Sequence, residues 1–125
     1  MSEFFIPGLR LGVAQAGIKH EGHDDLTLIE IAEGSSTAAV FTLNAFRAAP
    51  VVVAQRNNAN QDARYILINS GNANAGTGKP GMNACEASCA AIAKLMNDVP
   101  NRVLPFSTGV IGELLPVDKI EAALP

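Results

Sequence analysis

Aromatic side chains are scarce in this chain of 125 residues, since five Phe and one Tyr make up 5% of it and Trp is absent. Platforms on which nucleobases or sugar rings could stack are therefore also scarce. Hydrophobic residues nevertheless amount to 48% of the sequence, so the interior must be filled by aliphatic side chains. A chain of this length buries roughly two thirds of its unfolded surface, enough for one core.

The sequence also lacks a block of basic residues and a long apolar run. Nine basic and twelve acidic residues are interspersed and give a net charge of −3, which makes nucleic acid and anionic membranes poor partners. No stretch approaches the roughly 20 apolar residues of a membrane span, and the N-terminus has no basic region followed by an apolar run and a cleavage site. We therefore expect a cytoplasmic protein.

Cysteine is limited to Cys85 and Cys89, four residues apart in an Ala-rich helical segment. At this spacing two side chains share a helix face, but the backbone geometry rarely permits a disulfide. We interpret the pair as buried free thiols in preference to a redox or metal pair.

The first half of the chain predicts strands joined by short turns. Alternating apolar residues predict a strand from Leu9 to about Ile18, followed by a polar turn at Lys19 to Asp25. Leu26 to Ala32 carries apolar residues on both pleat faces, which is typical of a strand covered on both sides. Thr37 to Thr42 is predicted as a third strand, and the short turns favour an antiparallel meander.

The second half predicts helices alternating with strands. We expect a short helix from Pro50 to about Arg56, a buried strand from Tyr65 to Asn69, and an irregular segment from Ser70 to Gly81, which is rich in Gly. Asn83 stands three residues before Glu86, the spacing of an N-cap and its reciprocal partner.

In the helix that follows, Cys85, Cys89, Ile92 and Met96 fall on one face, and the helix should end before Pro100. The rest of the chain is predicted as a strand from Arg102 to Phe106, a loop from Ser107 to Gly112, and a helix from Val117 to Leu124. Residues 1–125 are therefore expected to form one α/β (α+β) domain, cut short at its C-terminus, with a mostly antiparallel or mixed sheet packed against helices.

Two motifs suggest binding sites and are rejected on their spacing. His20 and His23 with their neighbouring carboxylates resemble a metal site, but a zinc-protease helix needs His at i and i+4, and these two lie three apart in a turn. Gly76, Gly78 and Gly81 fit a GxGxxG loop, but no acidic residue ends the next strand, and Pro80 crowds the place of the pyrophosphate. We expect no metal, nucleotide or other cofactor.

Ser107-Thr108-Gly109 is the preferred candidate site, because it directly follows a buried strand. The amide of Gly109 can approach a ligand closely because glycine has no Cβ, and the Thr108 hydroxyl supplies a second donor. Two convergent donors are what a tetrahedral oxyanion requires, although Thr-Gly pairs also occur in ordinary turns. Both His residues lie in one turn and no Ser or Thr has an activating base nearby in the sequence, so any nucleophile is expected outside these residues.

Three segments resemble conserved blocks of the ornithine acetyltransferase family of arginine biosynthesis: FTLNAFRAAPV (Phe41 to Val51), NSGNANAGTG (Asn69 to Gly78) and STGVIGELLP (Ser107 to Pro116). The opening GLRLGVAQAGIK is similar to the family's N-terminal strand. The resemblance runs along essentially the whole chain and in the family's order.

The resemblance implies acetyl transfer from N-acetylornithine to glutamate through an acetyl-threonine intermediate, and leaves open whether acetyl-CoA is a second donor. The nucleophile in that family is a threonine freed by self-cleavage, whose own α-amine has a pKa suited to act as the base. The family's oxyanion pair maps onto the Thr108 hydroxyl and the Gly109 amide. The implied fold is a layered sandwich of the N-terminal-nucleophile type.

The sequence departs from the family in one respect, because the self-cleavage motif and the downstream substrate-binding residues are absent. The resemblance therefore implies an incomplete α chain that is inactive alone. Its partners would be the remainder of the α chain and the β chain that carries the Thr, in a heterotetramer of two α and two β chains. Two alternatives stay open: an N-terminal-nucleophile aminopeptidase of related architecture, and a non-catalytic domain that binds small anions.

Overall fold

The computed structural model describes residues 6–124, which form four strands, three α-helices and one 3-10 turn. In chain order they are β1 (Leu9–Ala14), β2 (Leu26–Ile31), α1 (Ala49–Asn60), β3 (Tyr65–Asn72), α2 (Gly78–Met96), the 3-10 turn (Pro100–Arg102), β4 (Val103–Val110) and α3 (Val117–Ala123). No helix within these residues is long and apolar enough to cross a membrane.

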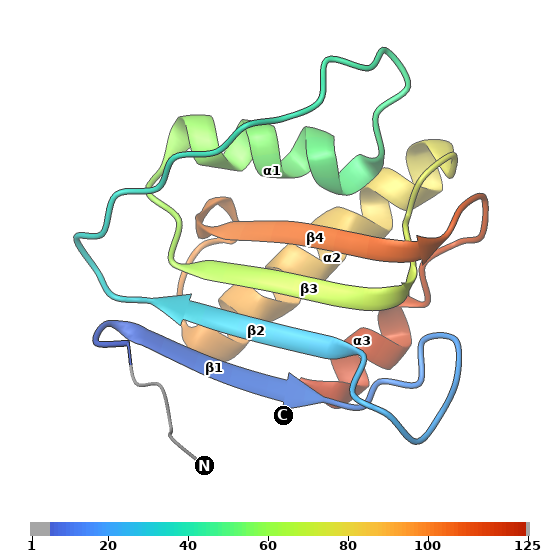
Figure 1. The fold of residues 1–125 in the computed structure, drawn as a ribbon, viewed down its shortest axis with the longest axis horizontal. Helices are drawn as coiled ribbons and strands as arrows, with labels where there is room; N and C mark the ends of the chain where they lie inside the picture. Colours follow the sequence, from blue (N-terminus) through green and yellow to red (C-terminus); the bar gives the residue numbers. More distant parts are fainter. Residues whose placement is uncertain (1–5, 125) are drawn as a thin grey trace.

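The strands form one mixed sheet in the order β1-β2-β3-β4 (Figure 1). β1 pairs with β2 in antiparallel fashion, as the predicted meander requires for its first two strands. β2 then pairs antiparallel with β3 in place of the predicted third strand, and β4 lies parallel to β3. A parallel neighbour needs a crossover connection, and α2 supplies it. The predicted α/β class with a mixed sheet packed against helices is confirmed.

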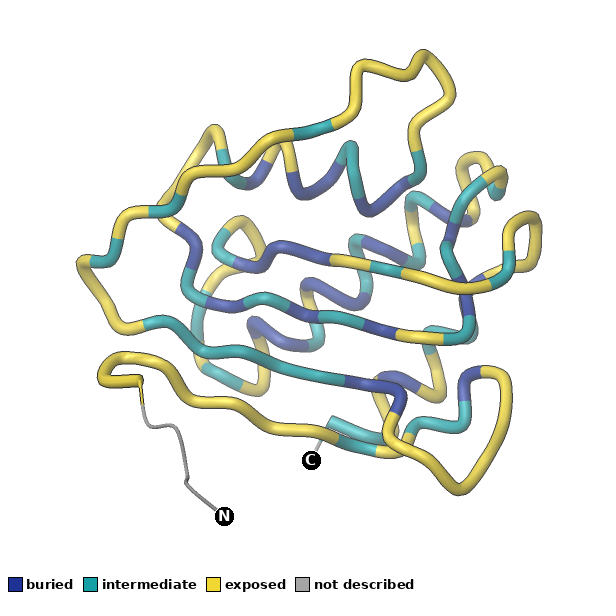
Figure 2. The backbone as a smooth tube through the Cα atoms, viewed as in Figure 1, coloured by how far each residue is buried: buried dark blue, intermediate teal, exposed yellow. Residues whose placement is uncertain are grey.

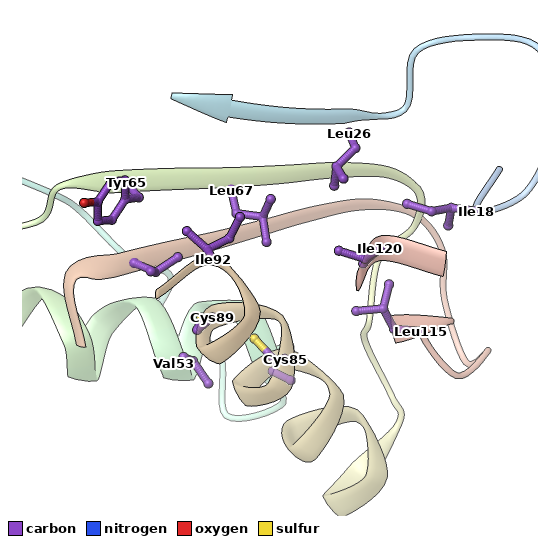
Figure 3. Packing of buried hydrophobic residues seen from close by; sticks show 12 residues of the cluster. Ile18, Leu26, Val53, Tyr65, Leu67, Cys85, Cys89, Ile92, Leu115 and Ile120 are labelled. Carbon is purple, nitrogen blue, oxygen red and sulfur yellow. The ribbon is translucent and has the colours of Figure 1, made fainter. Parts of the chain in front are cut away.

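The helices cover one face of this sheet. In Figure 1, α2 and α3 lie behind the strands, and α1 flanks the edge formed by β4. Leu67 points from the sheet toward Ile92 of α2, and Leu26 lies nearer Ile120 of α3 (Figure 3). Ile92 is fully buried. The predicted helix face is confirmed, because Cys85 and Cys89 are also buried and Met96 packs against the same cluster.

The opposite face of the sheet is open along β1 in the described residues, whereas Leu104 of β4 on that face is buried against Ala54 of α1. Leu9, Leu11 and Val13 of β1 are 38%, 67% and 56% exposed, and β1 is exposed along nearly its whole length in Figure 2. Thr27–Ile31 of β2 are only half-buried. The prediction that this strand is covered on both sides is therefore not met within residues 6–124.

The predicted strand at Thr37 to Thr42 is wrong, since this segment forms no ladder in the structure. Val40 and Leu43 are almost completely exposed. A β-rich sequence becomes a strand only when a neighbouring strand accepts its backbone hydrogen bonds. The sheet ends at β4, and α1 packs beside that edge, so the segment has no strand to join here.

The first strand ends at Ala14 rather than near Ile18. The reason is the buried carboxylate of Asp25, which accepts hydrogen bonds from the backbone N–H groups of Ala16 at 2.7 Å and Ile18 at 2.8 Å. These bonds replace the ladder bonds that a longer strand would make. The pattern of apolar residues does not show that the Asp25 side chain would bind these N–H groups in place of a neighbouring strand.

The segment predicted as irregular, Ser70 to Gly81, is regular at both ends. β3 continues to Asn72 and α2 begins at Gly78, so the predicted N-cap at Asn83 is wrong and Thr77 precedes the helix instead. Pro80 fits because a helix's first turn needs no bond from its nitrogen. The glycines and the proline at residues 78–81 therefore belong to the first turn of a helix and not to a loop.

The ends of α1 and β4 also differ from those predicted. α1 extends to Asn60 rather than Arg56, and β4 extends to Val110 rather than Phe106. Ser107, Thr108 and Gly109 therefore lie in a strand, paired with β3, and not in the predicted loop. The final helix is confirmed at Val117–Ala123.

Candidate functional site

The carboxyl ends of β3 and β4 lie side by side at one end of the sheet, on the right in Figure 1. The pairing places Asn69 opposite Ser107, Ser70 opposite Thr108, and Gly71 opposite Gly109. Two sequence motifs that are far apart in the chain are thereby brought together. The carboxyl ends of parallel strands are a common place for binding and catalytic groups in α/β folds.

Buried asparagines organise the loop that follows β3. The Ser107 hydroxyl donates to Asn69 Oδ1 at 2.5 Å, and Asn69 Nδ2 donates to the carbonyl oxygen of Asn72 at 2.8 Å. Asn74 Nδ2 donates to the carbonyl oxygen of Gly81 at 2.9 Å, and Asn74 adopts a left-handed backbone with φ of 48°. Buried amides of this kind satisfy backbone groups that the loop would otherwise leave unpaired.

Gly109 brings the backbone of β4 into direct contact with that of β3. A Cβ on Gly109 would stand 2.4 Å from the carbonyl carbon of Gly71 and 2.5 Å from the nitrogen of Asn72. Its φ of +131° is a conformation that L side chains rarely adopt. Only glycine fits this position, for reasons of both space and backbone angle.

Thr108 and Gly109 are both exposed, so the predicted donor pair is not sealed inside the core. Side chains alternate along a strand, and Thr108 therefore shares the open face of the sheet with Phe106, which is 45% exposed. The pair offers a hydroxyl and a glycine amide on adjacent residues at the end of a strand. Such donors suit an oxygen atom that gains negative charge.

The histidine pair and the GxGxxG glycines, the other two candidate motifs, do not form binding sites in the described residues. His20 and His23 lie exposed in a turn with ring centroids 6.4 Å apart, and no group of three or more His, Cys, Asp or Glu side chains within residues 6–124 is arranged to hold a metal. Gly81 is buried inside the first turn of α2, where its N–H donates to the carbonyl oxygen of Thr77. Gly81 of the GxGxxG pattern thus serves the packing of this helix, since a Cβ there would clash with Thr77.

The buried Cys85 thiol is poorly suited to act as a nucleophile. The hydrogen bond with Cys89, together with burial, raises the pKa of the Cys85 thiol well above its ordinary value. A thiol with a raised pKa carries little of the reactive thiolate at neutral pH.

The sequence did not reveal that an asparagine of the Asn69 to Gly78 motif would form hydrogen bonds with the Ser107 to Pro116 motif. Asn72 Nδ2 donates to the carbonyl oxygens of Glu113 and Leu114, each at 3.1 Å. One signal was present, since each motif directly follows a predicted strand, and parallel strands align their carboxyl ends. The pairing of these two strands was not predicted, so that conclusion was not drawn.

Residues 10–125 match the family described as the ArgJ family. This chain belongs to the ArgJ family. The match includes the asparagine loop and the Thr108–Gly109 pair, so the resemblance in these motifs extends over nearly the whole sequence.

Relatives in this family are much longer than the chain. The arginine biosynthesis bifunctional protein ArgJ of Methylococcus capsulatus is 62% identical over 120 residues, which are 96% of this chain and 29% of that protein. The protein of the same name from Pseudomonas syringae pv. tomato is 55% identical over 119 residues, again 29% of its length. The chain thus spans about 29% of the length of these two ArgJ proteins.

Two crystal structures share the fold. The arginine biosynthesis bifunctional protein ArgJ of Bacillus halodurans is 37% identical with a TM-score of 0.87, over 93% of this chain and 61% of that one. The ornithine acetyltransferase of Mycobacterium tuberculosis, in complex with ornithine, is 36% identical with the same TM-score, over 93% of this chain and 63% of that one. The sheet and helices described above are therefore an arrangement shared with these two proteins.

The buried thiols yield a first prediction. Cys85 and Cys89 should resist an aromatic disulfide reagent in the folded protein, because both are buried and the pKa of Cys85 is raised. Both should react within minutes in denaturant. An Ala90→Cys variant provides the control, since residue 90 is exposed on the same helix. Rapid labelling of the unsubstituted folded protein would contradict this interpretation.

The close approach of β4 to β3 yields a second prediction. Gly109→Ala should lower the free energy of unfolding by more than about 4 kcal/mol, because a backbone clash adds to a strained φ. Gly112→Ala is the matched control, with a φ of +84° but nothing within 4 Å of the new Cβ; it should cost only about 1–2 kcal/mol. Equal losses in urea denaturation would show that the contact with Gly71 is unimportant.

Proposed function

We propose that the protein containing this chain transfers an acetyl group from N-acetylornithine to glutamate, and that Thr108 and Gly109 stabilise the oxyanion of that reaction. Membership of the ArgJ family supports the reaction class. A relative of nearly the same fold is named as an ornithine acetyltransferase and binds ornithine. The observation that carries the assignment to these residues is an exposed hydroxyl and glycine amide, adjacent at the paired ends of β3 and β4.

The proposed mechanism has two acyl-transfer steps. The nucleophile, a threonine of the part of the protein outside residues 1–125, attacks the acetyl carbonyl of N-acetylornithine and releases ornithine. Glutamate then attacks the acetyl-threonine ester and regenerates the hydroxyl. Each step passes through a tetrahedral intermediate whose oxygen carries a negative charge. Residues 1–125 supply donors to that oxygen but no nucleophile, so this chain alone should be inactive.

The Thr108 hydroxyl and the Gly109 amide act in the same way in both steps. Both residues belong to β4, which would hold their donors in place before the reaction, and donors that need no reorganisation when the charge develops are the source of the rate gain. Gly109 contributes a backbone donor that no bulkier residue could present here, because any Cβ at this position would clash with the β3 backbone. Thr108 contributes a side-chain donor on the open face.

The third prediction tests the oxyanion-stabilising role of Thr108 in the full-length protein that contains this chain. Thr108→Val keeps the shape of the side chain and removes the hydroxyl, so kcat should fall about 100-fold with KM little changed, since the lost interaction exists only in the transition state. Acetyl transfer from N-acetylornithine to glutamate is the measurement, with free acetate followed in parallel.

The control is Thr27→Val, which removes a hydroxyl from the same face of the sheet on β2. It should leave kcat within about twofold of the unsubstituted protein, because Thr27 lies on β2, two strands away from β4, and valine keeps the apolar character of this face. Unchanged turnover in Thr108→Val would remove the oxyanion assignment. Release of acetate in place of transfer would favour the aminopeptidase-like hydrolase.

The open face of the sheet supports a proposal about partners. Leu9, Leu11 and Val13 pair with Ile31, Ile29 and Thr27, and the same face continues over Ile66 and Ile68 of β3. Antiparallel sheets that face water are polar on that side, whereas this face is almost entirely aliphatic. A continuous apolar surface of this kind marks an interface.

We assign that interface to the remainder of the longer protein. Residues 1–125 are then one incomplete domain, whose open face is covered by the rest of the α chain and by the β chain within an assembly of two α and two β chains. The length of the relatives supports this occupant, since more than two thirds of each lies outside the matched region. Sheet-on-sheet packing would cover an aliphatic face of this shape.

The fourth prediction tests the interface. Leu11→Glu places a charge on the open face and should abolish co-elution of the α and β chains in size-exclusion chromatography, because an unpaired charge is costly to bury. Leu95→Glu is the matched control on the outer side of α2, where Leu95 is 45% exposed. An intact assembly in Leu11→Glu would show that this face stays in solvent.

A further inference from the structure

The segment that carries Thr108 and Gly109 is held on both sides by the end of β3 and the loop that follows it. Before the pair, the Ser107 hydroxyl binds Asn69. After the pair, the carbonyl oxygen of Val110 accepts from the Ala73 N–H at 2.9 Å, and the Gly112 N–H donates to the carbonyl oxygen of Ala75 at 2.8 Å. The direction of the two candidate donors therefore depends on this loop.

Asn72 is the side chain that connects the two segments. It is 3% exposed, and both ends of its amide are used. Nδ2 donates to the carbonyl oxygens of Glu113 and Leu114, while Oδ1 accepts from the Asn74 N–H at 2.8 Å. A side chain without both a donor and an acceptor could not make this bridge.

The bridge fixes the place where the chain leaves β4. Glu113 and Leu114 follow the strand in a Gly-containing turn, and without Asn72 their carbonyl oxygens would lose these donors. Gly109 already lies against the backbone of Asn72, so a shift of Asn72 also displaces the strand end directly. A displacement of about 1 Å in a catalytic group can reduce a rate about 100-fold.

We infer that Asn72 is a positioning residue of the oxyanion site, acting through Thr108 and Gly109 without touching the substrate. This inference rests on the proposed function and adds a residue that family membership does not assign. Its effect should appear in kcat and not in KM, since the donors it places act only in the transition state.

The test uses Asn72→Asp in the full-length protein. The substitution keeps the acceptor for the Asn74 N–H and removes both donors to residues 113 and 114. We expect kcat to fall about 10- to 100-fold with KM within about twofold. Activity is measured well below the lowest unfolding midpoint of the series, and Asn72→Ser serves in the same way if the aspartate variant does not fold.

Asn57→Asp is a matched control. Asn57 is 1% exposed, and its Nδ2 also donates to two carbonyl oxygens, those of Pro100 at 3.3 Å and Val103 at 2.9 Å, at the opposite end of β4. Both variants should lower the unfolding midpoint to a similar degree, but Asn57→Asp should leave kcat unchanged. An equal fall of kcat in both would show that Asn72 merely stabilises the fold, and would overturn the inference.

A double-mutant cycle with Thr108→Val separates the inference from the proposed function. If Asn72 positions Thr108, then Thr108→Val should cost less than about tenfold in the Asn72→Asp background, against about 100-fold alone. Full multiplication of the two effects overturns the positioning role and leaves the oxyanion assignment intact. No effect of Thr108→Val on its own overturns both.

Discussion

The structure depends on the contact between the backbones of β3 and β4 at their carboxyl ends. Gly109 allows the two strands to approach so closely that a Cβ at this position would clash with the backbone of Gly71 and Asn72. Because this contact is made of backbone, it fixes the positions of the flanking groups more rigidly than side-chain packing would. The exposed Thr108 hydroxyl, the Gly109 amide and the asparagine loop all take their places from it.

Two kinds of interior hold this contact in place. Below the sheet, aliphatic side chains and two thiols pack between α2 and the strands, so the number of aromatic residues can be small. At the strand ends the interior is polar instead, with Asn69, Asn72 and Asn74 buried and hydrogen-bonded. A polar cluster of this kind is stable only when its groups find partners, and its bonds specify one loop conformation where apolar packing would permit several.

The open side of the sheet complements this arrangement. Helices cover one face, whereas the aliphatic side chains of β1 and their neighbours are exposed on the other. Thr108 lies on the open face with Phe106. The donors proposed for catalysis and the surface proposed for the rest of the protein therefore adjoin one another, as a site shared between two parts of one enzyme requires.

The sequence alone determined the local features of this protein. The period of apolar residues predicted β1, β2 and the buried face of α2, and the Thr108–Gly109 motif was identified from its residue types and its place after a strand. The tertiary structure decided what depends on neighbours distant in the chain. Thr37 to Thr42 has strand propensity but no strand to pair with, and β1 ends early because Asp25 binds its backbone. Likewise, the parallel pairing of β3 with β4 and the reach of Asn72 to residues 113 and 114 join segments about 40 residues apart. Hydrophobic period and propensity describe a residue's immediate surroundings, and such contacts exist only once the chain has folded.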